Sequence, residues 1–346
     1  MLISRFRFLM ASLAMVVMGS LASVVNAGDA SIEFAPATGA GSSGLGAGKH
    51  IVFVSGDEEY RSEEACPALA KILSQRHGFK CTVLFAVDPK TGEIDPNASN
   101  IPDTAAVNTA DLVVFHLRFR NLPDEQMKPL ADYIESGKPM VGLRTSTHAF
   151  NIPGGKTYSK YTWTNGDKAY EKGFGKQVLG ETWVSHWGNH GSQSTRGIIA
   201  EGKKDHPILR GIADGDIWGP SDVYEAKPIG DSDTLVLGQI VAGMKPTDPP
   251  ADTPRNKPMM PVAWTKSYKG DSGKTSRVFT STMGAATDLE AEGTRRLVVN
   301  GCLWALGLEE KIPAKTDVAL VGEYQPTKFG FNAFKKGTKP TDYLIK

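Results

Sequence analysis

Residues 50–61 of this 346-residue chain read HIVFVSGDEEYR, a short apolar run that ends in a polar loop. No polar residue interrupts the run Ile51–Val54, which is typical of a strand buried on both faces of a parallel sheet. Residues 62–76 then follow with a helical pattern. A strand that leads through a polar loop into a helix is the first half of a βαβ unit.

The same unit recurs through the first half of the chain. Further apolar runs lie at 82–87, 112–115 and 139–143. Residues 124–136 form an amphipathic helix that places Met127, Leu130 and Ile134 on one face. Alternating strands and helices predict right-handed crossovers. We therefore predict an α/β fold, with a doubly wound, mostly parallel sheet covered by helices on both faces.

The second half has weaker patterns. Apolar runs at 197–200, 234–241, 261–264 and 277–281 are separated by long segments rich in Gly and Pro, and a helix is predicted from about 290 to 306. We interpret these runs as further strands of the same sheet, with long insertions between them. One domain is therefore predicted over residues 49–312, followed by a tail, 313–346, that has no clear periodicity.

The N-terminus has the layout of an export signal. Arg5 and Arg7 precede an uncharged apolar run that ends in Val25-Asn26-Ala27, a small-x-small cleavage site. Residues 1–27 are therefore predicted to be a signal peptide, which places the protein in the periplasm or outside the cell. An uncleaved membrane anchor is the alternative. Residues 28–48 are rich in Gly, Ala and Ser and are predicted to be a flexible linker.

Charge and cysteine content narrow the possible partners. Loss of Arg5 and Arg7 with the signal peptide would change the formal net charge from +1 to −1. We therefore expect no nucleic-acid partner, and no membrane partner once the signal is cleaved. Cys66 and Cys81 lie at opposite ends of the first predicted helix, too far apart for a disulfide. The third cysteine is Cys302, and the sequence does not indicate its state.

Polar loops follow three of the predicted strands, at 55–61, 116–120 and 144–148. In an open parallel sheet, ligands bind beyond the carboxyl ends of the strands, so these loops should meet at one edge. Arginines and carboxylates together would fix the hydroxyl groups or oxyanions of a small molecule. Each residue taken singly could equally be a solvated loop charge. The binding candidates from these loops are Asp57, Tyr60, Arg61, His116, Arg118, Arg144 and Ser146.

Two histidines, His186 and His190, lie four residues apart. On a helix they would share a face and suit a metal, but the glycines around them indicate a loop, and the glutamate of an H-E-x-x-H motif is absent. We therefore assign neither a metal nor a cofactor. We expect a loop in which Trp183 or Trp187 stacks on a sugar ring while a histidine hydrogen-bonds or transfers a proton.

Glu59 and His148 complete the catalytic candidates, with His186 and His190. Glu59 lies in the loop after the first strand, where neighbouring charges could shift its pKa. His148 lies in the loop after the fourth strand. Ser146 with His148 is a weaker pairing as nucleophile and base, because residues i and i+2 of a turn need not face each other and no orienting acid is evident.

Six landmarks resemble the ThuA-like (trehalose utilisation) family of the class I glutamine amidotransferase-like superfamily. Their order along the chain, from about residue 50 to 310, is more specific than any one of them. They are 142–146 (GLRTS), 206–211 (HPILRG), 222–224 (DVY), 261–264 (PVAW), 277–284 (RVFTSTMG) and 300–307 (NGCLWALG).

This resemblance implies a flavodoxin-like α/β fold in which a sharp turn follows a central strand. Glutamine-hydrolysing relatives place a cysteine nucleophile on that turn, and ThuA-like proteins often place a histidine there, whereas this chain has Arg144. Ala285 likewise stands where many relatives have a histidine. With no thiol at the turn, we do not expect glutamine amidotransfer. Asp222 and Tyr224 belong to a family landmark near the pocket and are added as binding residues.

Two functional hypotheses remain. The first is an exported enzyme that acts on a carbohydrate-derived small molecule by acid–base chemistry; the second is a non-catalytic sugar-binding or scaffold protein that keeps the fold without the nucleophile. The charged loops and the two histidines favour the enzyme, whereas Arg144 and Ala285 favour the binding protein. Either hypothesis predicts a small sugar-like ligand, and a homo-oligomer is an open alternative.

Overall fold

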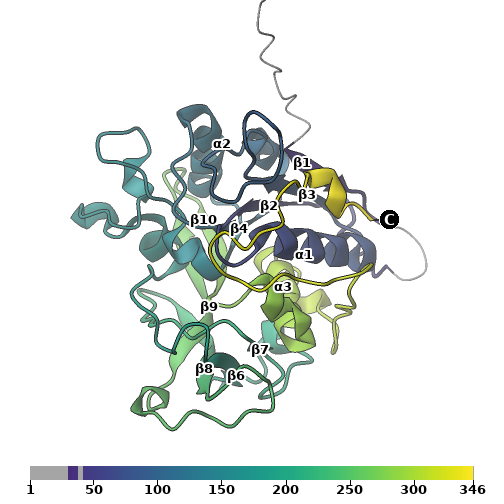
Figure 1. Ribbon diagram of the computed structural model, residues 1–346, viewed down its shortest axis with the longest axis vertical. Coiled ribbons are helices and arrows are strands. Elements are labelled where there is room, and N and C mark those ends of the chain that lie inside the picture. The colour runs from purple at the N-terminus through teal and green to yellow at the C-terminus, as the bar shows by residue number, and fades with distance from the viewer. Residues whose placement is uncertain (1–29, 38–41, 346) are drawn as a thin grey trace, which may run out of the picture.

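One ten-stranded sheet runs through the part of the chain that the computed structural model describes, residues 30–37 and 42–345 (Figure 1). The predicted signal peptide lies outside these residues. The strands are β1 Ser31–Phe34, β2 His50–Gly56, β3 Lys80–Phe85, β4 Leu112–Leu117, β5 Met140–Leu143, β6 Ser194–Ile199, β7 Trp218–Gly219, β8 Asp233–Val241, β9 Met260–Lys269 and β10 Thr275–Ser281. The three α-helices in this range are α1 Ser62–His77, α2 Asp124–Glu135 and α3 Glu292–Ala305.

The middle of the sheet is parallel, as the first half of the sequence predicts. The sheet order is β1-β3-β2-β4-β5-β10-β9-β8-β6-β7. Neighbours from β3 to β10 in this order all pair in parallel. Every residue of β2 is buried, because β2 lies between two other strands and both of its faces are covered.

The rest of the sheet is antiparallel, which differs from the predicted mostly parallel sheet. β10, β9, β8, β6 and β7 pair in antiparallel order, and β1 pairs antiparallel with β3 at the other edge. A short turn joins β9 to β10, and so short a connection can only reverse the chain. The sheet is therefore mixed, with its parallel strands in the middle.

Helices cover both faces of the parallel strands. Ile51 and Phe53 of β2 belong to a core cluster that also contains residues of α1 and α3. Val52 and Val54 point to the opposite face and belong to a cluster with residues of α2. In Figure 1, α1 and α3 lie together on one side of the sheet and α2 lies on the other. The alternation along β2 therefore produces two cores, as expected for a strand buried on both faces.

The predicted linker, residues 28–48, needs correction because four of its residues form β1. Ile32 and Phe34 of this strand are buried against the core beside α1. β1 caps the edge of β3, whose backbone groups would otherwise be unpaired. The predicted absence of a Cys66–Cys81 disulfide is confirmed, since Cys66, Cys81 and Cys302 are all free and buried.

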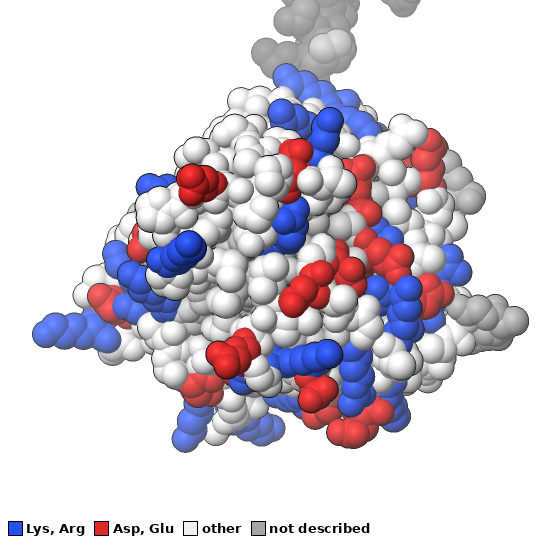
Figure 2. Space-filling model, turned by 90° about the horizontal axis from the view of Figure 1, so that it is seen from below, with Lys and Arg blue, Asp and Glu red and all other residues white. Residues whose placement is uncertain are grey.

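The surface carries both signs of charge. On the face shown in Figure 2, basic and acidic side chains are interspersed. None of the helices among the described residues is long and apolar enough to cross a membrane.

Helix α3 approaches the sheet closely at Gly301. A methyl group at this position would lie 2.3 Å from a ring carbon of Phe279 in β10. We predict that Gly301→Ala forces the helix away from the strand and lowers the free energy of unfolding by about 1–3 kcal/mol. Thermal and urea unfolding would measure this. Gly154→Ala is the control, since that site opens into free space; equal effects of both changes would contradict the close packing.

Glu63, in the first turn of α1, gives a prediction for pH. Its carboxylate is buried 3.6 Å from the Arg61 guanidinium. Burial raises the pKa of Glu63 from 4.5 to about 8, although Arg61 partly offsets this. A pKa that is higher in the folded state makes a stabilising contribution that is complete below pH 4.5 and is lost as pH rises through about 8.

We therefore expect the unfolding free energy to fall between about pH 4.5 and 8, by about 1.4 kcal/mol for each unit of pKa shift. Glu63→Gln should flatten this slope, as measured by urea unfolding across the pH range. Glu125→Gln, an exposed carboxylate in α2, is the control and should keep the slope. An unchanged slope in Glu63→Gln would show that another group titrates.

Candidate functional site

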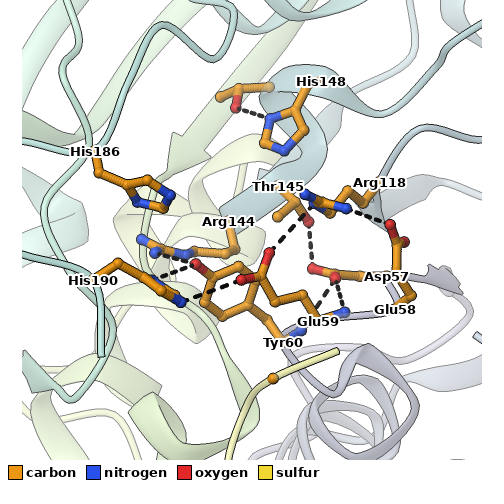
Figure 3. Close-up of polar contacts among 12 residues, drawn as sticks. Asp57, Glu58, Glu59, Tyr60, Arg118, Arg144, Thr145, His148, His186 and His190 are labelled. Atoms are coloured by element: carbon orange, nitrogen blue, oxygen red, sulfur yellow. Dashed lines mark hydrogen bonds and ion pairs between the residues drawn. The ribbon is translucent and has the colours of Figure 1, made fainter. Parts of the chain in front are cut away.

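Three loops meet at the carboxyl ends of β2, β4 and β5 (Figure 3). Each contains a non-glycine residue with a left-handed backbone: Arg61 (φ 60°), Phe119 (φ 53°) and Arg144 (φ 45°). Such backbones are costly for residues with a side chain and persist where the surrounding structure holds them. These three strained residues therefore lie at the edge of the sheet where the sequence predicts a site.

Arg144 occupies the sharp turn after β5 and is completely buried. Its Nη1 donates to the carbonyl oxygens of Asp222 (2.8 Å) and Thr282 (2.7 Å), and its Nη2 donates to Tyr60 Oη and to Asp222 Oδ1, each at 2.9 Å. The guanidinium lies over the Tyr224 ring, 3.8 Å from its centroid. Arg144 thus contacts residues from three separate segments of the chain.

Asp57 holds the loop after β2 in its conformation. Its Oδ1 accepts hydrogen bonds from the backbone N–H groups of Glu59 (2.7 Å) and Tyr60 (3.1 Å). Its Oδ2 accepts one from the Thr145 hydroxyl and lies 3.5 Å from His116 Nε2. Burial alone would raise the pKa of Asp57, but the His116 and Thr145 contacts hold it well below its usual range. Asp57 is therefore a buried carboxylate that positions its neighbours.

Glu58 and Glu59 face the arginines of the loop after β4. Glu58 pairs with Arg118, and its Oε2 lies 2.9 Å from Arg120 Nη2. Glu59 Oε2 lies 3.4 Å from Arg118 Nε. Burial raises the pKa of Glu59, an effect that Arg118 partly offsets. Glu59 is thus a carboxylate that can hold a proton more readily than a solvated one.

His186 and His190 share the carboxylate of Asp222. His186 Nδ1 lies 2.8 Å from Asp222 Oδ2, and His190 Nδ1 lies 3.0 Å from Asp222 Oδ1. Burial would raise the pKa of Asp222, but Arg144 and the two imidazoles hold it well below its usual range. An ionised carboxylate only accepts hydrogen bonds, so each imidazole donates through Nδ1.

The outer nitrogens of the two histidines therefore differ in their surroundings. His190 Nε2 lies 3.3 Å from Glu59 Oε1, close enough to exchange a proton. His186 Nε2 has no hydrogen-bond partner among the described protein residues, and 39% of the His186 side chain is exposed. The two ring centroids are 4.8 Å apart. His186, whose Nε2 can accept a proton, thus lies beside His190, which can share a proton with Glu59. Figure 3 shows both imidazole rings near Arg144 and Glu59.

Backbone pairing between two loops brings these groups together. The N–H groups of Trp187 and Gly188 both donate to Val223 O, at 2.8 and 3.0 Å. The N–H of Glu225 donates to Ser185 O at 3.0 Å. This register places Asp222 beneath the histidines, although 36 residues separate Asp222 from His186 in the chain.

Aromatic rings border the histidines on one side. The His148 ring lies 4.9 Å from the ring of Phe119, 5.7 Å from that of Trp183 and 6.4 Å from that of Tyr224. Trp183 also contacts His186, with 5.8 Å between ring centroids. Burial and the nearby Arg118 lower the pKa of His148 well below its usual value, so its imidazole is neutral.

The structure separates the predicted residues into those at the site surface and those beneath it. His186 and His190 are partly exposed, whereas Arg61, His116 and Ser146 are completely buried. Ser146 Oγ donates to Phe115 O at 2.7 Å, so it does not face His148 as a nucleophile would. The buried residues position the loops. The predicted candidates at or just below the surface are Glu59, Arg118, His148, His186, His190, Asp222 and Tyr224, whereas Tyr60 is completely buried.

Of the two tryptophans considered for sugar stacking, the structure brings Trp183 to the site. Trp187 instead donates from Nε1 to Arg255 O at 2.7 Å, and its ring lies beneath the Arg255 guanidinium. Glu58, Thr145 and Phe329 also contact the site residues but were not predicted from the sequence. Glu58 and Thr145 lie in loops already singled out for their polarity, so that signal could have found them. Phe329 comes from the tail and gave no signal.

His186, His190 and Asp222 are also the residues that could hold a metal ion, since their donor atoms all lie within 4.8 Å of one another. The sequence pattern indicated only the two histidines as possible metal ligands, and the fold brings the Asp222 carboxylate to them. The permanently charged Arg144, 2.9 Å from Asp222 Oδ1, opposes a second cation there. The distances between the imidazole nitrogens and the Asp222 oxygens are those of hydrogen bonds, so they suit shared protons better than a bound metal ion.

Comparison with known proteins identifies the family. The model of the trehalose utilisation family, ThuA, matches residues 50–305. Solved ThuA-like proteins from Parabacteroides merdae (13% identity, 82% of this chain and 98% of that one, TM-score 0.45) and Bacteroides uniformis (14%, 79% and 95%, 0.47) are similar. No match was found among curated proteins. The family match spans well over half of the sequence, and the chain belongs to the ThuA family.

Proposed function

We propose that this protein is an exported enzyme that transfers protons on a carbohydrate-derived small molecule. His186 would act as the base and the His190–Glu59 pair as the proton donor. The observation that carries this proposal is the shared carboxylate, Asp222, which orients both imidazoles through Nδ1 and leaves their Nε2 atoms toward the site. This is the base-and-orienter part of a catalytic triad without its nucleophile.

The substrate class is supported by the family description, trehalose utilisation, and by the chemistry of the site. A sugar ring presents hydroxyl groups along its edges and C–H groups on its faces. Carboxylates and imidazoles bind the former, and rings such as Trp183 cover the latter. Export is proposed from the N-terminal pattern of residues 1–27.

The alternative is a sugar-binding protein without catalysis, which the buried Arg144 at the nucleophile position favours. A thermal-shift screen of the protein against mono- and disaccharides, oxidised sugars and divalent metals separates these functions, because a ligand of the folded state raises Tm. A sugar that stabilises the protein and is converted to product supports the enzyme. Stabilisation without conversion supports the binding protein, and stabilisation by metal alone would support a metal site at Asp222.

The two histidines give the mutational test. We expect His186→Ala and His190→Ala each to reduce kcat on the sugar found in the screen by about 10²–10⁴-fold, the usual contribution of a general acid or base. Tm should change little, because both side chains are partly exposed. His206→Ala, at a histidine that contacts Trp304, is the control. Full activity in both site variants would exclude the proposed roles.

The Arg144–Asp222 pair gives a test of positioning. Removal of one partner leaves the other charge buried and unpaired, so Arg144→Ala and Asp222→Ala should each lower the free energy of unfolding by about 3–5 kcal/mol. The double variant should lose less than the sum of the two, because no unpaired charge remains. Urea unfolding of the four proteins measures this coupling. Strict additivity would show that the pair is not coupled.

A further inference from the structure

The C-terminal segment reaches the site from outside the family match, which ends at residue 305. In Figure 1 this segment, drawn in yellow, runs from α3 across α1 toward β1 and β3. The segment has no periodic sequence pattern, and it contains no strand among the described residues. Its order must therefore come from contacts with the rest of the protein.

Hydrogen bonds fasten the segment to the loop and helix that follow β2. The N–H of Gly330 donates to Glu59 O at 2.8 Å, and Arg61 Nη2 donates to Gly330 O at 3.0 Å. The N–H of Thr327 donates to Glu64 Oε2 at 2.6 Å. Gly330 has φ 146°, a conformation that favours glycine. The segment is thus attached at the candidate acid, Glu59, and at two residues that follow it, Arg61 and Glu64.

Phe329 closes the space beside His190. Its ring centroid lies 5.3 Å from that of Tyr60 and 5.5 Å from that of His190, and only 7% of the residue is exposed. Together with Tyr60 and Ala285 it forms a small apolar cluster separate from the two main cores. Phe329 therefore limits the site beside His190, whereas Trp183 contacts His186.

Phe331, unlike the buried Phe329, is mostly exposed to solvent, with an exposed fraction of 58%. Its ring lies against the Arg118 guanidinium, 5.0 Å from centroid to Cζ, and Phe119 lies against the same guanidinium at 4.5 Å. Arg118 is in turn held by Glu58 and Glu59. An exposed ring is thus held in one orientation beside the candidate catalytic carboxylate.

We infer that this C-terminal segment is a wall of the active site and that Phe331 is the surface on which one face of a bound sugar ring lies. The inference rests on the proposed function for its substrate class. A ring that stacks on Phe331 would have its edge near Arg118 and Glu59, whose charged groups bind hydroxyls. The most exposed large apolar side chain of the described residues would then have a ligand to cover it.

The stacking role is tested with the sugar that stabilises the wild-type protein in the thermal-shift screen. We expect Phe331→Ala to weaken its binding about tenfold, the effect of about 1.4 kcal/mol from one lost aromatic contact, and Phe331→Trp to retain it. Leu344→Ala removes another exposed apolar side chain of the tail and should have no effect. Unchanged affinity in Phe331→Ala, by isothermal calorimetry, would overturn the stacking role.

The wall is tested without any sugar, by the rate at which diethyl pyrocarbonate modifies His190, followed by mass spectrometry. Phe329→Ala should speed modification of His190 several-fold relative to His186, which is also partly exposed but has no ring contact with Phe329. A chain that ends at Lys328 should do the same, with its melting temperature measured to show that it folds. Unchanged rates in both would overturn the wall.

The two tests separate the proposals. If no sugar binds the wild-type protein, the proposed function and the stacking role both fail, while the modification rates still decide whether the segment covers the site. If a sugar binds and is converted but Phe331→Ala leaves its affinity unchanged, only the stacking role fails.

Discussion

Arg144 and Asp222 form an ion pair in which neither side chain is exposed to solvent, and the site is built around it. A buried ion pair is stable only when further hydrogen bonds support both charges, so the pair fixes its surroundings. Arg144 has four hydrogen-bond contacts, and Asp222 also accepts from both histidines. The pair thereby connects the parallel strands, which supply Arg144, to the loops of the antiparallel half, which supply Asp222, His186 and His190.

The division of the sheet explains how this combination arises. Parallel strands bring their polar loops to one edge, and the strained residues Arg61, Phe119 and Arg144 lie in those loops. The antiparallel strands extend the same sheet and carry long insertions between them. The segment between β5 and β6 holds the histidines, and the segment between β7 and β8, paired with it through backbone hydrogen bonds, holds the carboxylate that they share. The histidines and the carboxylate that they share thus come from one half of the fold, and Arg144 and Glu59 come from the other.

The sequence predicted the parallel strands, the three α-helices and the polar edge, because periodicity and loop polarity are local signals. It identified His186 and His190 and, separately, Asp222, but it did not connect them, since Asp222 reaches the histidines only through the pairing of Val223 with Trp187 and Gly188. The composition of residues 28–48 also led to the wrong prediction of a linker there. β1 is buried because it pairs with the edge of β3, which local composition does not reveal. Likewise, nothing near Phe329 in the sequence indicates that Tyr60 lies beneath it.

The attachment of Gly330 to Arg61 joins residues 269 positions apart, near opposite ends of the described chain. A polypeptide still being made or threaded through a membrane lacks one of the two partners. The loop after β2 therefore remains without its C-terminal cover until the last residues arrive, and loop closure over such a distance is slow. A chain shortened before residue 327 would therefore lack the contacts that Thr327 and Gly330 make with Glu64, Glu59 and Arg61.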